Sequence, residues 1–105
     1  MWHHGLHYVW MEFADRGTED VYDGLNSERA RKRLPVVLHE KARNKLSILA
    51  FAESLDDLRA PPSNHLEKLR GDRAGQYSIW INDRYRICFR WGSDGATDVA
   101  IVDYH

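Results

Sequence analysis

Residues 69–91 read LRGDRAGQYSIWINDRYRICFRW. Within them, 76–82 and 85–91 alternate apolar and polar residues and are joined by the tight connection at 83–84. A period of two is typical of strands that have one apolar and one polar face. Because so short a connection joins antiparallel neighbours, the stretch predicts a β-hairpin. One face would be apolar and the other rich in arginine.

Further strands are predicted on both sides of this hairpin. Residues 66–68 indicate a short strand before a turn at 71–75, and residues 97–104 indicate the last strand. An apolar run at 8–14 indicates a first strand near the start of the sequence. The short connections predict an antiparallel sheet.

Two helices are predicted between the first strand and the hairpin. Thr18 has the character of an N-cap, two acids follow it, and this helix would end near Gly24. Pro35 is suited to open a second helix, which would run to about Glu53 with an apolar stripe on one side. The fold class is therefore α+β: a small antiparallel β-sheet with two N-terminal-half helices packed on its apolar face.

Length and composition indicate one domain over residues 1–105. No apolar run has the roughly 20 residues of a membrane span, and the first residues do not resemble a signal peptide. The single cysteine, Cys88, cannot form an internal disulfide, so we expect a cytoplasmic protein without a membrane partner.

Charge is strongly segregated along the chain although the net charge is −1. Residues 29–45 hold seven Lys or Arg against one Glu, and residues 65–91 hold six against three acids. Local patches rather than the net charge decide where a phosphate backbone can bind. RNA is therefore an admissible partner, although charge alone does not require it.

The arginine face is the first group of candidate site residues. Arg86 lies in mid-strand, and Arg70 and Arg73 flank the glycine turn at 71. Guanidinium groups grip phosphate oxygens and would stabilise the extra charge of a five-coordinate phosphorus. The further candidates for RNA contacts are Lys68, Arg84, Arg90 and Trp80. The alternative is that the arginines solvate an open sheet face and that Trp80 serves packing.

The end of the sequence supplies the second group: Asp103, Tyr104 and His105. They offer a carboxylate, a phenol and an imidazole for proton transfer, although a terminal residue is often frayed and idle. No metal site is predicted, because His3, His4 and His7 lack a fourth ligand. Cys88 is interpreted as a packing residue, and His39 and His65 as surface or helix-end residues.

Four segments resemble the HigB toxins of the RelE/ParE superfamily. They are LRAPP (58–62), LEKLRGDRAGQYSI (66–79), YRICFRW (85–91) and DVAIVDYH (98–105). The resemblance runs from about Trp10 to the end and implies a RelE-like fold. It also implies a ribosome-dependent mRNA endonuclease that needs no metal or other cofactor. Its expected partners are the ribosome with its mRNA and a HigA-like helix-turn-helix antitoxin. The antitoxin would either cover the arginine face or bind the helices. We favour the helices, because packing on the sheet leaves their basic outer side free. Operator DNA would be contacted only through the antitoxin complex.

The resemblance also assigns individual positions. Arg73 and Arg86 match basic positions of the family pattern, and residues 103–105 match its end. Arg70 stands where relatives commonly carry Lys, and Glu67 where some relatives carry His. Residues 1–10 precede the usual family start, so they are an extension or lengthen the first strand, and Met11 is an alternative start.

Two other functions stay open at this stage. One is a ParE-like gyrase inhibitor without enzymatic activity, although such toxins lack the terminal Asp-Tyr-His and the cationic strand. The other is a weakened homologue that acts mainly as an antitoxin-bound co-repressor, consistent with Glu67 and the acidic N-terminal segment.

Overall fold

A computed structural model describes residues 11–104. Over these residues the α-helices are α1 (Arg16–Asp23), α2 (Glu28–Arg33) and α3 (His39–Phe51). Short 3₁₀ helices are η1 (Val36–Leu38), η2 (Leu55–Arg59), η3 (Pro62–Asn64) and η4 (Gly71–Arg73). The strands are β1 (Glu67–Lys68), β2 (Tyr77–Trp80), β3 (Tyr85–Gly92) and β4 (Gly95–Asp103). They form one antiparallel sheet in the order β1-β2-β3-β4.

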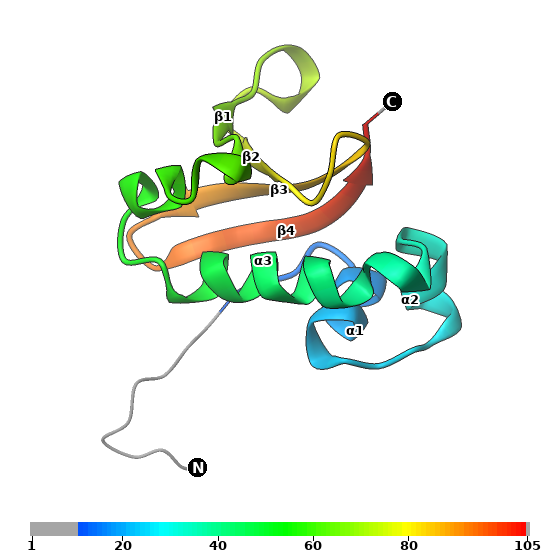
Figure 1. Cartoon of the computed structure of the whole chain (residues 1–105). Coiled ribbons are helices and arrows are strands. Elements are labelled where there is room, and N and C mark those ends of the chain that lie inside the picture. Colours follow the sequence, from blue (N-terminus) through cyan, green and yellow to red (C-terminus); the bar gives the residue numbers. More distant parts are fainter. Residues whose placement is uncertain (1–10, 105) are drawn as a thin grey trace.

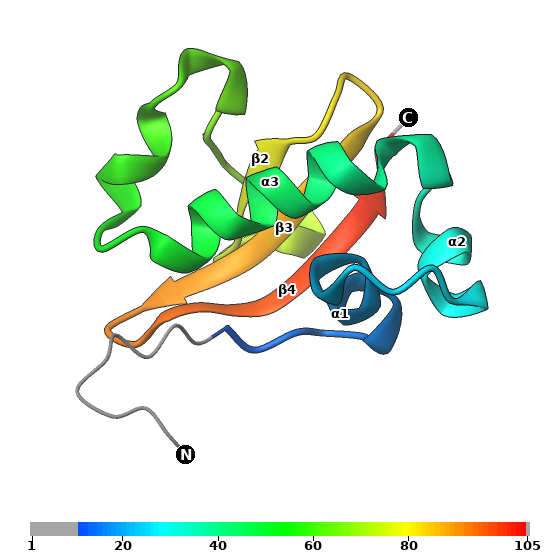
Figure 2. The same cartoon turned by 60° about the horizontal axis from the view of Figure 1, so that its bottom comes forward.

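The α-helices gather on one side of the sheet, and the segment that carries η4 lies on the other (Figure 1). In the turned view α3 crosses in front of β2 and β3, while α1 lies beside β4 (Figure 2). The layered α+β fold with helices on one sheet face is thus confirmed. No helix of residues 11–104 combines the length and apolar character needed to cross a membrane.

The strand register gives the sheet two chemically different faces. Ile79 pairs with Ile87, which pairs with Ile101, and all three side chains are buried on the helix-covered face. One residue along each strand, Ser78 pairs with Cys88 and Trp80 pairs with Arg86. Alternation places these residues on the opposite side, here called the open face.

The first predicted helix exists, but its cap differs from the prediction. Helix α1 begins after Asp15, whose carboxylate accepts a hydrogen bond from the backbone N–H of Thr18 at 2.7 Å. Asp15 is therefore the N-cap, and Thr18 is fully buried inside the first turn. Its hydroxyl instead accepts the backbone N–H of Ile101 at 3.0 Å, which ties α1 to β4.

The second predicted helix is shorter than predicted, and the prediction missed α2, which precedes it. Ser27 caps α2 by accepting the N–H of Ala30 at 3.1 Å. Leu34 and Pro35 are extended, as the residue before a proline prefers, and they interrupt the basic segment. Helix α3 therefore begins at His39 rather than Pro35 and ends at Phe51 rather than Glu53.

The predicted first strand is largely replaced by an extended segment. Residues 8–10 lie outside the described residues, and Phe13 makes an isolated parallel bridge to Val99 of β4. Ala14 donates its N–H to the carbonyl of Val99 at 2.9 Å, and Val99 donates to Glu12 at 3.0 Å. This segment lies along the β4 edge of the sheet.

A buried lysine fastens α3 to the chain that enters β1. Lys45 is 9% exposed and donates from Nζ to Oδ1 of Asn64 at 2.6 Å. Asn64 is fully buried and donates from Nδ2 to the carbonyls of Leu58 and Ala60 at 3.1 and 3.2 Å. Burial, followed by the charge of Lys41, holds the pKa of Lys45 below its usual range. The contact fixes η3 against the helix layer.

Candidate functional site

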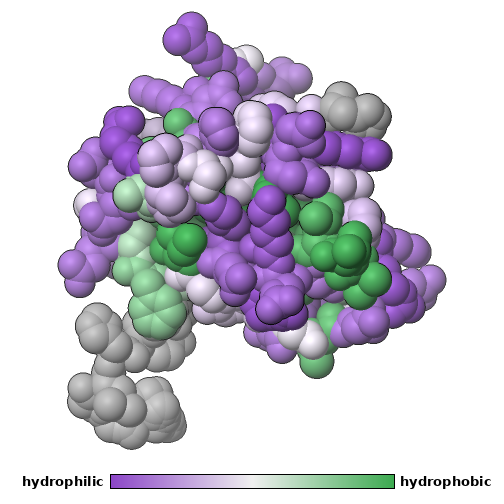
Figure 3. Space-filling model, in the orientation of Figure 1, coloured by the Kyte–Doolittle hydropathy of each residue, from purple (hydrophilic) through white to green (hydrophobic). Residues whose placement is uncertain are grey.

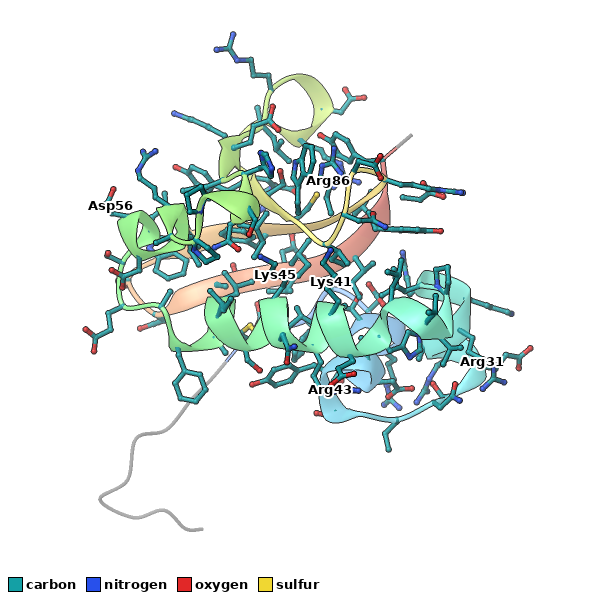
Figure 4. All side chains as sticks on the ribbon, in the orientation of Figure 1. Arg31, Lys41, Arg43, Lys45, Asp56 and Arg86 are labelled. Atoms are coloured by element: carbon teal, nitrogen blue, oxygen red, sulfur yellow. The ribbon has the colours of Figure 1, made fainter. Side chains whose placement is uncertain are left out.

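Arg86 is the central side chain of the open face. It lies on the far side of the sheet from Lys41 and Lys45 (Figure 4). It is only 9% exposed, and its Nη1 donates to the backbone carbonyl of Asn82 at 2.7 Å. Its Cζ lies 4.1 Å from the Trp80 ring centroid and 5.2 Å from the Tyr104 ring centroid, both within cation–π range. The guanidinium is therefore held in place before any ligand binds.

Tyr104 follows β4 and flanks Arg86 from the side opposite Trp80. Val102 is the β4 partner of Arg86, and Tyr104 comes two residues later. The backbone N–H of Tyr104 donates to the carbonyl of Arg84 at 2.7 Å. This bond holds the end of β4 against β3, with the Tyr104 side chain 39% exposed.

His65 completes a row of side chains that runs across the strands. Its ring stacks on Trp80 with 3.9 Å between centroids and 26° between planes. Two planar groups cannot share one face of an indole at such short distances, so His65 and Arg86 cover opposite faces of Trp80. The resulting row, in order, is His65, Trp80, Arg86 and Tyr104.

This row changes the interpretation of two residues. Trp80 was considered as a platform for a nucleotide base, but neither indole face is open to a base in this arrangement. His65 was interpreted as an isolated surface residue, yet the β1–β2 register, continued by two residues, places it directly opposite Trp80. Pairing the predicted strand at 66–68 with 76–82 was the signal that could have found it.

Arg73 is the second candidate arginine, and its charge acts on Cys88 of the open face. It lies in η4, and its Nη1 donates to Oε1 of Gln76 at 3.3 Å. Burial raises the pKa of the Cys88 thiol, while the charges of Arg73 and Arg86 oppose that shift. The charges of Arg73 and Arg86 therefore both act on this part of the open face. The net rise keeps Cys88 protonated, as suits a packing residue.

Two buried polar atoms of the open face have no hydrogen-bond partner among the described residues. They are Oγ of Ser78 and Nε of Arg86. Buried polar groups are normally satisfied, because each unmet bond costs about 1–3 kcal/mol. A free N–H donor on a fixed cation is suited to an anionic oxygen that arrives with a ligand.

The other predicted site residues are distributed more widely. Arg84 forms a two-pronged ion pair with Asp103, at 3.0 Å from Nε and 2.8 Å from Nη2. That hydrogen bond, with the Asp103 charge, raises the pKa of Arg84. Arg90 pairs with Asp98 at 3.4 Å. These two arginines are thus engaged with carboxylates.

Lys68 and Arg70 are exposed. Lys68 lies opposite Tyr77, so the register places it on the other side of the sheet, and Arg70 precedes η4. His105 lies outside the described residues, as do His3, His4 and His7. Within residues 11–104, no three His, Cys, Asp or Glu side chains are grouped to hold a metal ion.

A second cationic feature lies among the helices. A hollow of about 430 Å³ opens between the start of α1 and α2. Its cationic lining residues are Arg16, Arg29, Lys32 and Arg33. Asp15 neutralises part of this charge, because its Oδ1 lies 3.1 Å from Nε of Arg33. This surface belongs to the helix layer rather than to the open face.

Comparison with known proteins places these observations in a family context. Residues 11–105 match the family model described as RelE-like toxin of type II toxin–antitoxin system HigB. The chain is 34% identical over 95 residues to Toxin HigB-1 of Vibrio cholerae. The aligned region covers 90% of this chain and 96% of that protein. It is 36% identical over 59 residues to an uncharacterized protein of Haemophilus influenzae, covering 56% and 58% of the two chains.

Solved structures show the same fold at low sequence identity. A YoeB–YefM complex from Staphylococcus aureus contains a chain that matches with a TM-score of 0.60 and 17% identity, covering 94% of this chain and 99% of that one. A heterotetrameric YoeB–YefM toxin–antitoxin complex matches with a TM-score of 0.55, 18% identity and the same coverage.

Proposed function

This chain belongs to the HigB-like family, the RelE-like toxins of type II toxin–antitoxin systems, and from that premise we propose that it is an endoribonuclease that cuts mRNA on the ribosome. It would work in the cytoplasm, where translating ribosomes are found, and without a metal or other cofactor. RNA cleavage needs a group that binds the scissile phosphate and groups that move protons.

The buried, fixed Arg86 with its unpartnered Nε is the observation that carries the proposal. An arginine on a merely solvated sheet face would be exposed, whereas this one is 9% exposed and held between two aromatic rings. Burying a cation costs free energy unless an opposite charge compensates it. A phosphodiester over Arg86, within reach of Arg73, would supply that charge.

The chemistry follows from the lability of RNA. The 2′-oxygen attacks the neighbouring phosphorus, the bond from phosphorus to the 5′-oxygen breaks, and a 2′,3′-cyclic phosphate and a 5′-hydroxyl form. Arg73 and Arg86 stabilise the charge that develops on the phosphate, and Arg70 extends the cationic surface from the exposed turn. Tyr104 carries a phenol that can donate a proton to the leaving 5′-oxygen.

Asp103 and Arg84 act as a positioning pair in this proposal. Their ion pair and the bond from Tyr104 to the Arg84 carbonyl hold the end of β4 where Tyr104 meets Arg86. Lys68 and Arg90 remain proposed contacts to RNA outside the scissile phosphate. His105 remains a proposed proton-transfer group beyond the described residues.

Single-turnover cleavage of mRNA on programmed ribosomes tests the activity. We expect the wild-type protein to cut the mRNA in the presence of EDTA and to leave 2′,3′-cyclic phosphate ends. We also expect its association with ribosomes to weaken steeply as the salt concentration rises. Gyrase inhibition without RNA cleavage would contradict the proposal. RNA that stays intact while operator binding with the antitoxin persists would favour a co-repressor.

We infer that a partner antitoxin docks on the helix layer of this chain. The solved neighbours YoeB and YefM form a toxin–antitoxin complex, and the position of the docking surface is inferred from the exposed side chains of this chain. An apolar cluster is exposed over the α2–α3 connection (Figure 3), where Val36 and Val37 are 53% and 83% exposed. The last turn of α2 beside it carries Arg31, Lys32 and Arg33. This combination suits an acidic antitoxin segment with apolar side chains of its own.

Hydrogen exchange with and without the helix-turn-helix antitoxin tests the docking surface. We expect protection across 31–38 and substitution of Val37 by Asp to weaken the complex at least tenfold. Protection restricted to residues 84–90 would place the antitoxin on the open face instead.

A further inference from the structure

His65 combines a strained backbone with a fixed ring, two features that an unconstrained surface histidine does not need. Its backbone has φ 47°, in the left-handed region that costs a non-glycine residue roughly 1 kcal/mol or more. Its ring is stacked on Trp80 at 3.9 Å while the side chain remains exposed. The imidazole is thus placed with a defined orientation and an accessible edge.

The surrounding chain holds this conformation firmly. Asn64, the preceding residue, is fully buried and receives the Lys45 ammonium at 2.6 Å. The backbone N–H of His65 donates to the carbonyl of Pro62 at 3.0 Å. Because strain of this kind persists only where the surroundings impose it, it points to a functional role.

The row geometry supplies what an in-line displacement requires. The attacking and leaving oxygens depart from opposite sides of the phosphorus, so the proton acceptor and the proton donor must flank the phosphate. His65 and Arg86 lie on either side of one indole, 3.9 Å and 4.1 Å from its centroid. Tyr104 lies beyond Arg86 in the other direction, at 5.2 Å. A phosphate over Arg86 would have an imidazole on one side and a phenol on the other.

We propose that His65 is the general base that removes the proton from the attacking 2′-hydroxyl. This proposal rests on the endoribonuclease function proposed above. The neutral imidazole takes the 2′-proton as the bond from the 2′-oxygen to phosphorus forms. The bond to the 5′-oxygen breaks, and that oxygen takes a proton from the Tyr104 phenol. Water then returns the protons, so the enzyme is regenerated and no oxidant, reductant or metal is consumed.

Trp80 is a positioning residue in this arrangement. Its two faces set the separation and the parallel orientation of His65 and Arg86. The next open-face residue on β1 is Glu67, which is exposed. It pairs with Ser78, two residues before Trp80 on β2. Glu67 follows His65 by two residues and lies on the same face, so it provides a matched control.

The test is single-turnover cleavage of mRNA on programmed ribosomes by wild-type protein and variants, with ribosome binding and thermal melting measured in parallel. His65→Phe keeps a ring on Trp80 but removes both nitrogens. We expect it to cut about 100-fold more slowly, with binding within threefold of wild type. Glu67→Gln should cut within threefold of wild type.

Chemical rescue separates proton transfer from packing. His65→Gly fits the left-handed backbone and leaves an opening at an exposed position, so added imidazole should restore its cleavage at least tenfold. Two results would overturn the role of His65 while leaving the endoribonuclease proposal intact. One is cleavage by His65→Phe at the wild-type rate, and the other is absence of rescue in a folded His65→Gly variant. Failure of the wild-type protein to cut mRNA on ribosomes would overturn the endoribonuclease proposal itself.

Discussion

The two faces of the sheet are built from the same strands but meet opposite physical demands. On the helix-covered face the row Ile79, Ile87, Ile101 is buried among apolar side chains with no polar group to satisfy. On the open face the corresponding row sets Arg86 between Trp80 and Tyr104 and leaves its Nε without a partner. The first face supplies stability, and the second places costly groups where a ligand can use them. The difference teaches that stability and cleavage should respond to different substitutions.

The largest expected effect is a loss of stability on substitution of Ile87, at the centre of the apolar row. Ile87→Ala removes a fully buried side chain and should lower the free energy of unfolding by about 2–5 kcal/mol. Denaturant titration measures the loss, and cleavage per folded molecule should stay near the wild-type value at low temperature. A loss below about 1 kcal/mol would mean that the layer collapses around the cavity.

Arg86→Lys should give the reciprocal result. The charge is kept, but the planar fork held between two rings is lost, so cleavage should fall about 10²–10³-fold. The midpoint of denaturation should stay near that of the wild type, because a buried cation contributes little net stability. If the variant unfolds early and cuts normally once folded, Arg86 belongs with the stabilising residues.

Asp20 offers a smaller, pH-dependent test within the helix layer. The Ser27 hydroxyl, at 2.5 Å, and then Arg29 lower the pKa of Asp20 from its usual 3.8, against the opposing effect of burial. A lowered folded-state pKa stabilises the protein above pH 3.8, and this contribution is lost as pH falls through the folded value. Asp20→Asn should therefore melt earlier than wild type at pH 7, with the gap narrowing in acid.

The Asp20→Asn substitution should not alter the open face. Cleavage by the folded variant at pH 7 should match wild type within twofold, since Asp20 joins α1 to the cap of α2. A melting gap that stays constant down to pH 2 would contradict the assignment of this carboxylate as a stabilising ion.

The smallest effect is expected from the exposed ion pair at the end of β4. Arg84→Gln should shift melting only slightly, because an exposed pair is screened by solvent and salt. Cleavage should fall no more than about threefold, because the backbone bond from Tyr104 to the Arg84 carbonyl survives the substitution and still holds the end of β4. A loss of 100-fold, measured in the same single-turnover assay, would restore Arg84 as a direct RNA contact.

The sequence was sufficient for the sheet because the hairpin alternation at 76–91 sorts its residues between the two faces. It was insufficient for α2, whose six residues ERARKR have no apolar periodicity and depend on the Ser27 cap and on Asp20. The α1 cap was misplaced because Asp15 and Thr18 are both good capping residues. Local pattern cannot choose between them without the packing of Thr18 on β4.

The candidate site was predictable where it follows strand alternation and hidden where it depends on register. Arg86 was identified because it lies in mid-strand among apolar residues. His65 was missed because its contact with Trp80 joins residues far apart in sequence through a strand only two residues long. Resemblance drew attention to Glu67, two positions away. The engagement of Arg84 and Arg90 with carboxylates likewise required three-dimensional pairing.

The segment at 11–14 has a consequence for how this protein can associate. By bonding to Ala96 and Val99 it occupies backbone groups in the first half of the β4 margin, and the opposite margin is the two-residue strand β1. Within residues 11–104, neither margin therefore offers a long unpaired ladder on which a foreign strand could be added. Association by strand addition, whether with a partner or in aggregation, is therefore disfavoured, and neighbours must recognise side chains on the faces of the molecule.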